Sequence, residues 1–225
     1  MPESLTAARW DAEYRAGRYA AEPPVAFVAT IVDTLAGRPA LRTRLGLYVG
    51  CGNGRNFLPL VDAGLALLGV DVSAEALRQL AARRPDRAAQ LHHADLFDFA
   101  PPAPVAYLIA IQVLQHGRRG DAERAFARVA ALLAPGGLFF LRVNSASTEV
   151  HHRHVVVERP DDGFTVEYQE GPKAGMAVHF YGRHELETLT APAFQTLRGP
   201  VEDVTRRPPP QRGAWAQWEA VYERV

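Results

Sequence analysis

The chain has 225 residues, and 25 Lys plus Arg residues balance 25 Asp plus Glu residues, so the formal net charge at pH 7 is +0. This length fits one domain with a sizeable core. The neutral balance argues against a nucleic-acid partner, because phosphate contacts usually demand a basic surplus. No apolar run reaches the roughly 20 residues that span a bilayer. No secretory signal pattern is present, and Cys51 is the one cysteine, so we expect a cytoplasmic protein without an intrachain disulfide.

Helical patterns fill the beginning of the chain. A first helix is predicted over residues 6–17, which have helical composition. A second is predicted to start at Pro24, because apolar residues recur at helical spacing until Gly37 ends the pattern. We expect residues 1–40 to form an N-terminal helical cap.

Short apolar segments alternate with helical segments between residues 45 and 144. Strands are predicted at 45–49, 65–70, 90–93, 105–111 and 138–143, and helices at 56–63, after the capping residue Ser73, and at 119–133. Such alternation is typical of βαβ units and a parallel sheet. Ligands bind at the carboxyl ends of the strands in sheets of this kind.

The pattern changes after residue 144. Residues 145–180 are polar, rich in histidine and partly strand-like, and residues 183–190 are predicted to form a helix. Two late strands are predicted at 194–204 and 215–222. The proline-rich connection between them suits an antiparallel pair.

The most conspicuous motif is the loop Gly50-Cys51-Gly52-Asn53-Gly54, between a predicted strand and a predicted helix. Glycines there let the backbone turn tightly and approach a ligand, and the helix behind them offers free N–H groups. Taken alone, the loop is equally typical of a strand-to-helix turn in any α/β protein.

Two acids follow at the ends of the next predicted strands. Asp71 comes about 20 residues after the glycines, which is the spacing of an acid that binds ribose hydroxyls. A helix-capping role is the alternative for Asp71. Asp95 follows the third strand and suits an adenine amino group, although a solvated loop acid fits that segment almost as well.

The remaining motifs are Ile109 to His116, leading out of the fourth strand, and Ala134-Pro135-Gly136-Gly137 before the fifth. The whole set, in this order, resembles the class I S-adenosylmethionine (SAM)-dependent methyltransferases. The segments Trp10 to Tyr14 and Gly54 to Asn56 resemble the small-molecule branch, which includes tellurite- and thiopurine-type enzymes. In that branch an N-terminal segment folds over the cofactor.

The resemblance implies one methyltransferase domain over residues 1–225, with a doubly wound, Rossmann-like α/β fold. Its seven-stranded sheet would have the last strand antiparallel and helices on both faces. The cofactor-binding core would span 45–144, a substrate-side insertion and helix 145–190, and strands six and seven 194–225.

The resemblance also implies residue roles. The glycines would shape the loop against the methionine part of SAM, Asp71 would hold the ribose, and Val72, Asp95 and Leu96 would contact the adenine. Gln112 would lie beside the transferable methyl group. The implied cofactor-binding residues are Tyr14, Gly50, Gly52, Asn53, Gly54, Asn56, Asp71, Val72, Asp95, Leu96 and Gln112.

The implied reaction is an in-line displacement, in which an O, N or S nucleophile of a small molecule takes the methyl group. His116 is the candidate general base, with a backbone-bonded loop histidine as the alternative. Arg142, His179 and Tyr181 are candidate substrate contacts. A surface ion pair for Arg142 and a core strand for the other two are the alternatives.

We expect no metal site. The histidines at positions 151, 152, 154, 179 and 184 lack any recognisable ligand spacing. A structural zinc site needs about four ligands at defined geometry. The role of the histidine-rich segment 151–154 stays open.

Two positions depart from the methyltransferase pattern. Tyr48 stands where the family usually has an acid two residues before the first glycine, and Tyr107 where it often has one in the fourth strand. The first departure keeps a second hypothesis open, a non-catalytic SAM-binding regulatory module. A nicotinamide-dependent oxidoreductase is a third, which Ala94-Asp95-Leu96 and the Pro-Gly-Gly before the fifth strand disfavour. The sequence assigns neither the methyl acceptor nor the oligomeric state.

Overall fold

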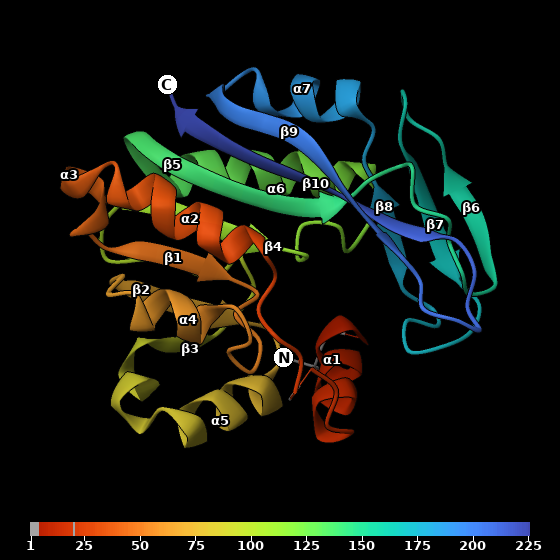
Figure 1. Ribbon diagram of the computed structural model, residues 1–225, viewed down its shortest axis with the longest axis horizontal. Coiled ribbons are helices and arrows are strands. Elements are labelled where there is room, and N and C mark those ends of the chain that lie inside the picture. The colour runs from red at the N-terminus through yellow and green to blue at the C-terminus, as the bar shows by residue number, and fades with distance from the viewer. Residues whose placement is uncertain (1–4, 20) are drawn as a thin grey trace. The chain divides into compact units, whose positions relative to one another are not determined.

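A computed structural model of the chain describes residues 5–19 and 21–225 (Figure 1). Residues 1–4 and 20 of the predicted N-terminal cap therefore lie outside the described residues. The chain groups into two compact units. The first comprises Met1–Ile109 with Leu132–Gly137, and the second comprises Ala110–Ala131 with Leu138–Val225.

The main sheet has seven strands in the order β3-β2-β1-β4-β5-β10-β9. In chain order these strands are β1 (Gly46–Val49), β2 (Leu67–Asp71), β3 (Leu91–His93), β4 (Val105–Ile111), β5 (Leu133–Asn144), β9 (Phe194–Arg206) and β10 (Ala214–Arg224). β1 pairs in parallel with β2, and β2 with β3. β10 is antiparallel to both β5 and β9, and Figure 1 shows it running between them. The predicted seven-stranded sheet with its last strand antiparallel is confirmed.

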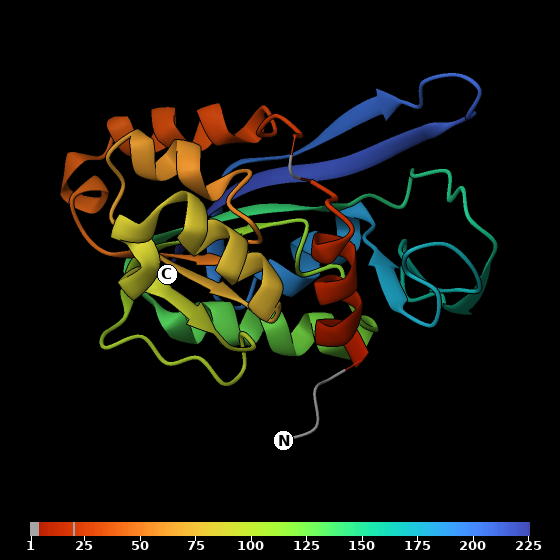
Figure 2. The ribbon, with the colours of Figure 1, turned by 90° about the horizontal axis from the view of Figure 1, so that it is seen from below.

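The first unit contains five α-helices among the described residues. They are α1 (Leu5–Arg15), α2 (Phe27–Ala36), α3 (Pro39–Arg42), α4 (Phe57–Asp62) and α5 (Ala74–Arg83), followed by the 3₁₀ helix η1 (Pro85–Gln90). α2 buries Phe27, Ile31 and Leu35 and ends at Gly37, as its periodicity predicts. It packs beside α4, as Figure 2 shows. α1 packs against α5.

The predicted cap of α5 is present. Ser73 has extended backbone geometry, and its hydroxyl oxygen accepts a hydrogen bond from the backbone N of Ala76 at 3.0 Å. Glu75 adds an acid in the first turn. Both features stabilise the positive end of the helix dipole, so this boundary is fixed locally.

Tyr107 lies in the core at the place where the family pattern often has an acid. A side chain at Gly46 could not coexist with it, because a Cβ there would lie 2.1 Å from the Tyr107 ring. The phenol donates to the backbone O of Ala66 at 3.1 Å. Gly46 and Tyr107 therefore form a packed pair that needs no carboxylate.

The Pro-Gly-Gly segment does not separate helix from strand as predicted. Helix α6 (Arg119–Leu132) ends immediately before β5 begins at Leu133, so Pro135 and both glycines already belong to the strand. Gly136 takes φ +72°, which a glycine adopts at little cost. The left-handed turn is thus absorbed into the start of β5.

The second unit holds a smaller antiparallel sheet that the sequence revealed only as partly strand-like character. Its strands are β6 (His154–Glu158), β7 (Phe164–Tyr168) and β8 (Ala177–Phe180), in that spatial order. Val166, Tyr168, Val178 and Phe180 form its core. Helix α7 (Arg183–Thr190) follows as predicted. Within the described part of the chain, no helix combines the length and apolar character needed to cross a membrane.

Candidate functional site

The glycine loop follows β1 and leads into α4. Gly50, Gly52 and Gly54 all have left-handed backbone, with φ of 69°, 53° and 95°. A Cβ at Gly52 would lie 2.4 Å from the Tyr14 hydroxyl, and one at Gly54 would lie 2.6 Å from a methyl carbon of Leu80. Glycine is therefore required here both by conformation and by space.

Asp71 ends β2 and is the acid that organises this loop. Its carboxylate is buried, and Oδ2 accepts from the backbone N of Gly52 at 2.7 Å. Oδ1 accepts from the backbone N of Ser73 at 2.8 Å. Burial raises the pKa of Asp71, and the two backbone N–H groups oppose that rise by favouring the charged form.

Asp71 also has capacity for a ligand. A carboxylate offers about four acceptor positions, of which the described contacts use one on each oxygen. Two acceptor oxygens on one rigid carboxylate match a pair of vicinal hydroxyls. The alternative that Asp71 caps a helix describes it only in part. Asp71 accepts from the backbone N of Ser73, but the side chain that caps α5 is that of Ser73.

Tyr14 reaches the loop from α1. Its hydroxyl lies over Gly52, and its backbone O accepts from the Gln79 side chain on α5 at 2.9 Å. Burial raises the pKa of the Tyr14 phenol, so it stays protonated and able to donate. The structure thus brings Tyr14, Gly52 and Asp71 together in the first unit.

The contacts of Tyr48 show what this residue does at the position where the family usually has an acid. It is buried on β1, packs edge-on against Phe57, and hydrogen-bonds the Asn56 side chain. Asn56 Oδ1 in turn accepts from the backbone N of Val25 at 3.0 Å. The phenol therefore fixes Asn56, and Asn56 holds the chain segment that precedes α2.

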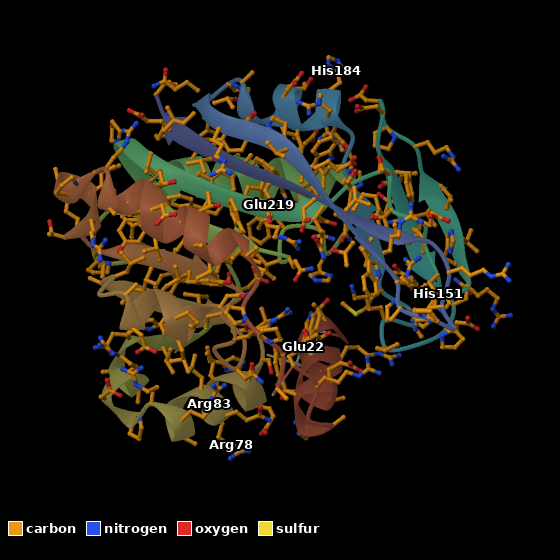
Figure 3. The ribbon with its side chains drawn as sticks, in the orientation of Figure 1. Glu22, Arg78, Arg83, His151, His184 and Glu219 are labelled. Atoms are coloured by element: carbon orange, nitrogen blue, oxygen red, sulfur yellow. The ribbon has the colours of Figure 1, made fainter. Side chains whose placement is uncertain are left out.

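Asn53 is buried at the tip of the glycine loop. Its backbone O accepts from the Arg83 guanidinium on α5 at 2.9 Å. Figure 3 labels Arg83 and Arg78 on this helix, and Arg78 pairs with Glu75 at 2.7 Å. The loop tip is thus held by a charged donor from α5.

The predicted adenine contacts lie at the ends of β2 and β3. Asp71 and His93 are register partners, so the residues that follow them share one edge of the sheet. Asp95 is exposed and its Oδ1 accepts from the backbone N of Phe97 at 2.9 Å, Leu96 is buried, and Val72 is half-buried. Asp95 therefore lies at the edge of the sheet where the carboxyl ends of β2 and β3 meet.

Gln112 follows β4 and belongs to the second unit. It has φ +57°, which is uncommon for a residue other than glycine and is often associated with functional sites. Its backbone N donates to the backbone O of Arg142 at 2.7 Å, and its side-chain Nε2 lies 3.5 Å from Gln217 Oε1. Gln217 Nε2 donates to Asn144 Oδ1 at 2.7 Å.

The amides of Asn144 and Gln217 were missed by sequence reasoning. Asn144 ends β5, so its place at a carboxyl strand end was a usable signal. Gln217 depends on the register of β10, where it lies opposite Asn144. No pattern in the sequence reveals that register.

His116 is partly buried, and its ring Nδ1 is shielded from solvent. The ring hydrogen-bonds the backbone of Gln112. Burial and, to a lesser extent, the nearby Lys173 charge lower the pKa of His116 to about 3. The imidazole is therefore neutral at physiological pH and a weak proton acceptor there.

The three candidate substrate residues are all engaged within the protein. Arg142 is buried and pairs with Glu219 at 2.8 Å and Asp203 at 2.6 Å. The phenol of Tyr181, fully buried, donates to the backbone O of Leu114. These contacts favour a structural role over substrate binding for both residues. Glu219, the partner of Arg142 on β10, is labelled in Figure 3.

His179 lies in a buried network. Its Nε2 bonds Glu185 Oε2 at 3.0 Å, and its Nδ1 bonds the Thr165 hydroxyl at 2.8 Å. Arg119 lies 2.5 Å from the other oxygen of Glu185. Both ring nitrogens of His179 are therefore used, which favours its role in holding β8, β7 and α7 together.

The other histidines do not assemble into a metal centre. Among the described residues, no group of three or more His, Cys, Asp or Glu side chains could hold a metal ion. Figure 3 shows His184 on α7 well separated from His151, which precedes β6. His154 Nδ1 bonds the backbone O of His152 at 2.8 Å.

Part of the chain is similar to a known protein family. Residues 47–139 match a family model described as a methyltransferase domain. None of the curated proteins compared matched the chain. The segment of this chain that is similar to that domain contains the glycine loop, Asp71 and Gln112.

Solved structures show the same fold. A 1,6-didemethyltoxoflavin-N1-methyltransferase from Burkholderia thailandensis, solved with 1,6-didemethyltoxoflavin and S-adenosylhomocysteine (SAH), has a TM-score of 0.67 at 20% identity, covering 98% of this chain and 88% of that one. The magnesium protoporphyrin IX methyltransferase from Synechocystis PCC 6803 with bound SAM gives 0.61 at 16%, covering 99% and 93%. The amino pentose methyltransferase CalS10 from Micromonospora echinaspora with SAM gives 0.60 at 18%, covering 95% and 97%.

Proposed function

We propose that this chain is a SAM-dependent methyltransferase that methylates an oxygen, nitrogen or sulfur atom of a small molecule. The observation that carries the proposal is the buried Asp71 carboxylate, which binds the backbone N–H groups of Gly52 and Ser73 and keeps acceptor capacity for ribose hydroxyls. The family match over residues 47–139 supports the same assignment.

The described residues fit the cofactor. Asp71 would accept from the ribose hydroxyls, and the left-handed glycine loop leaves room for backbone to approach the methionine part. Tyr14 would cover the loop from α1. Val72 and Leu96 would pack on the adenine, and Asp95 would accept from its amino group. Gln112 would lie beside the methyl group.

Bound SAM supplies a methyl group on a sulfonium sulfur that is already a good leaving group. The protein's contribution is therefore to align the acceptor and to exclude water. The strained Gln112 backbone is held by the backbone of Arg142 and by the His116 ring, so this residue is well fixed for alignment. The Asn144 and Gln217 amides extend its polar surroundings.

His116 is the candidate proton acceptor for a nucleophile that arrives protonated. Its pKa of about 3 makes it a poor base at neutral pH, because an efficient base has a pKa near the working pH. This favours acceptors that need no base, such as neutral amine or heterocyclic nitrogen. Similar structures named for N1-methylation and for amino pentose methylation support a small-molecule acceptor.

The position of α1 supports the small-molecule branch with an N-terminal cap. In that branch the N-terminal segment folds over the cofactor, and here Tyr14 of α1 lies over Gly52. The motif Trp10 to Tyr14 supplies both the aromatic cover and the contacts with α5.

A non-catalytic SAM-binding module is the second candidate, because Tyr48 replaces the usual acid. The buried Tyr48 bonds Asn56 in place of any ligand amino group. Separate assays discriminate the two functions. We expect SAH to bind in isothermal titration and methylated products to appear by mass spectrometry when SAM and a panel of small amines, phenols and thiols are supplied.

Binding with no product from any panel member would favour the module. Absence of SAM and SAH binding would contradict both functions.

A further inference from the structure

Asp11 on α1 is a buried carboxylate, only 4% exposed. Its Oδ1 accepts from the Ser73 hydroxyl at 2.5 Å and from the backbone N of Glu75 at 3.1 Å. Its Oδ2 accepts from Arg15 at 3.1 Å. The carboxylate thus binds the first turn of α5 from a helix about sixty residues away in the sequence.

The hydrogen bonds continue from Ser73 to the glycine loop. The backbone N of Ser73 donates to Asp71 Oδ1, and Asp71 Oδ2 accepts from the backbone N of Gly52. Ser73 is fully buried, and its hydroxyl and backbone N–H are both committed. One uninterrupted chain therefore links Asp11, Ser73, Asp71 and Gly52.

Other contacts hold α1 in the same position. The Gln79 side chain donates to the backbone O of Tyr14 at 2.9 Å, and the Tyr14 hydroxyl lies over Gly52. Trp10 and Tyr19 pack on Tyr14, with ring centroids 6.4 and 5.8 Å away. Docking of α1 and the shape of the glycine loop are thus determined by a common set of contacts.

We propose that Asp11 is a positioning residue, which fixes Ser73 and through it the orientation of the Asp71 carboxylate, so that docking of α1 and cofactor binding are coupled. The proposal rests on the proposed function, because Asp71 acts there as the ribose ligand. Coupling between two binding events is reciprocal, so the cofactor must stabilise docked α1 as much as docked α1 stabilises the cofactor.

A purely electrostatic role for Asp11 has the opposite sign. Burial raises the pKa of Asp71, and the nearby Asp11 charge adds to that rise. Removing the Asp11 charge would therefore favour ionised Asp71 and leave ribose binding unchanged or stronger. A positioning role predicts weaker binding.

The test is isothermal titration of SAH into the full chain, its Asp11→Ala and Asp11→Asn variants, and the control Glu13→Gln. We expect Asp11→Ala to weaken SAH binding about tenfold, since hydrogen bonds to a charged group are lost. Asp11→Asn should lose less SAH affinity than Asp11→Ala, because its amide oxygen still accepts from Ser73 and Glu75. Glu13 lies on α1 and pairs with Arg18 beyond the end of that helix, and the SAH affinity of Glu13→Gln should stay within about twofold of the parent.

Hydrogen exchange in residues 5–15 provides the reciprocal readout. We expect SAH to slow exchange there in the parent chain but not in Asp11→Ala, and ligand-free Asp11→Ala to exchange faster. A folded Asp11→Ala variant that binds SAH as tightly as the parent would overturn the proposal. If Asp11→Ala does not fold, Gln79→Ala replaces it: weaker SAH binding supports the coupling, and an unchanged affinity overturns it.

Failure of the proposed function gives a different result. The parent chain would then not bind SAH at all. The coupling is still decided by Asp71→Asn without ligand, because faster exchange in α1 supports the hydrogen-bonded chain and unchanged exchange overturns it.

Discussion

The two units use their buried polar side chains in different ways. In the first, Asp71 and Asn56 bind backbone N–H groups of the segments around the glycine loop, and Asp71 keeps acceptor capacity for a ligand. In the second, Arg142, His179 and Glu185 are engaged with other side chains. A buried polar group therefore indicates a ligand site only when its partners leave it bonding capacity.

This difference predicts which property a substitution changes in each unit. Substitutions in the first unit should mainly change cofactor affinity, whereas substitutions in the second-unit network should mainly change the free energy of unfolding. The two kinds of effect are measured independently on the same variants.

The largest expected effect on stability is that of substituting Glu185, which is fully buried against His179 and Arg119. Glu185→Ala removes the buried carboxylate from His179 and leaves Arg119 paired only with the exposed Glu123, so it should lower the free energy of unfolding by about 3–5 kcal/mol, measured by chemical denaturation. Glu187→Ala is the control on the same helix, because its pair with Arg183 is exposed and 3.9 Å long. Equal stability of the two variants would contradict the structural role of the network.

Asp71→Ala tests the first unit. Loss of the Asp71 carboxylate should weaken SAH binding by about 1.5–3 kcal/mol, because charged hydrogen bonds to the ribose disappear. Asp62→Ala is the control, since this aspartate forms a surface pair with Arg84. An unchanged SAH affinity in a folded Asp71→Ala variant would remove the role assigned to Asp71.

Gly52→Ala and Gly136→Ala together distinguish the steric effect of a new Cβ from the cost of left-handed backbone. A Cβ at this left-handed position costs about 1–2 kcal/mol and would meet the Tyr14 hydroxyl. Gly136 also has positive φ, but a Cβ there meets nothing within 4 Å. We expect both alanine variants to lose stability and only Gly52→Ala to lose SAH affinity as well, by titration. Equal SAH affinities would disprove the claim that this loop touches the cofactor.

At neutral pH His116 gives the smallest effect, because its contribution is confined to the acid side of the pH dependence of stability. Its folded pKa lies below the unfolded value of about 6.5, so the neutral ring stabilises the fold at higher pH. That stability is lost as the pH falls from about 6.5 toward about 3.

His116→Gln should therefore flatten the acid side of the stability curve, measured by denaturation between these pH values. The control is His184→Gln, which makes the same substitution at an exposed histidine. Identical acid limbs for His116→Gln and the parent would show that the ring is not held neutral by burial.

The features predicted correctly from the sequence are those that short segments determine. The Ser73 cap, the end of α2 at Gly37 and the strand-to-helix glycine loop each depend on residues within a turn or two. The seven-stranded sheet with its last strand antiparallel was predicted from the family resemblance, since local patterns alone do not specify which strands pair.

The features that were missed depend on contacts between distant residues. Glu185 meets Arg119, and Asp11 meets Ser73, across more than sixty residues in each case. The three-stranded sheet was missed because His154–Glu158 and its neighbours become strands by pairing with each other. The partner Glu219 of Arg142 was also missed, because the register of β10 places it opposite Arg142 and no motif reveals that register.

The central claim is that the loop at Gly50 to Gly54 and Asp71 bind SAM. Isothermal titration of the full chain with SAH and, separately, with NAD tests it most directly. The account predicts stoichiometric SAH binding that Asp71→Ala weakens, and no NAD binding. Tight NAD binding without SAH binding would contradict it.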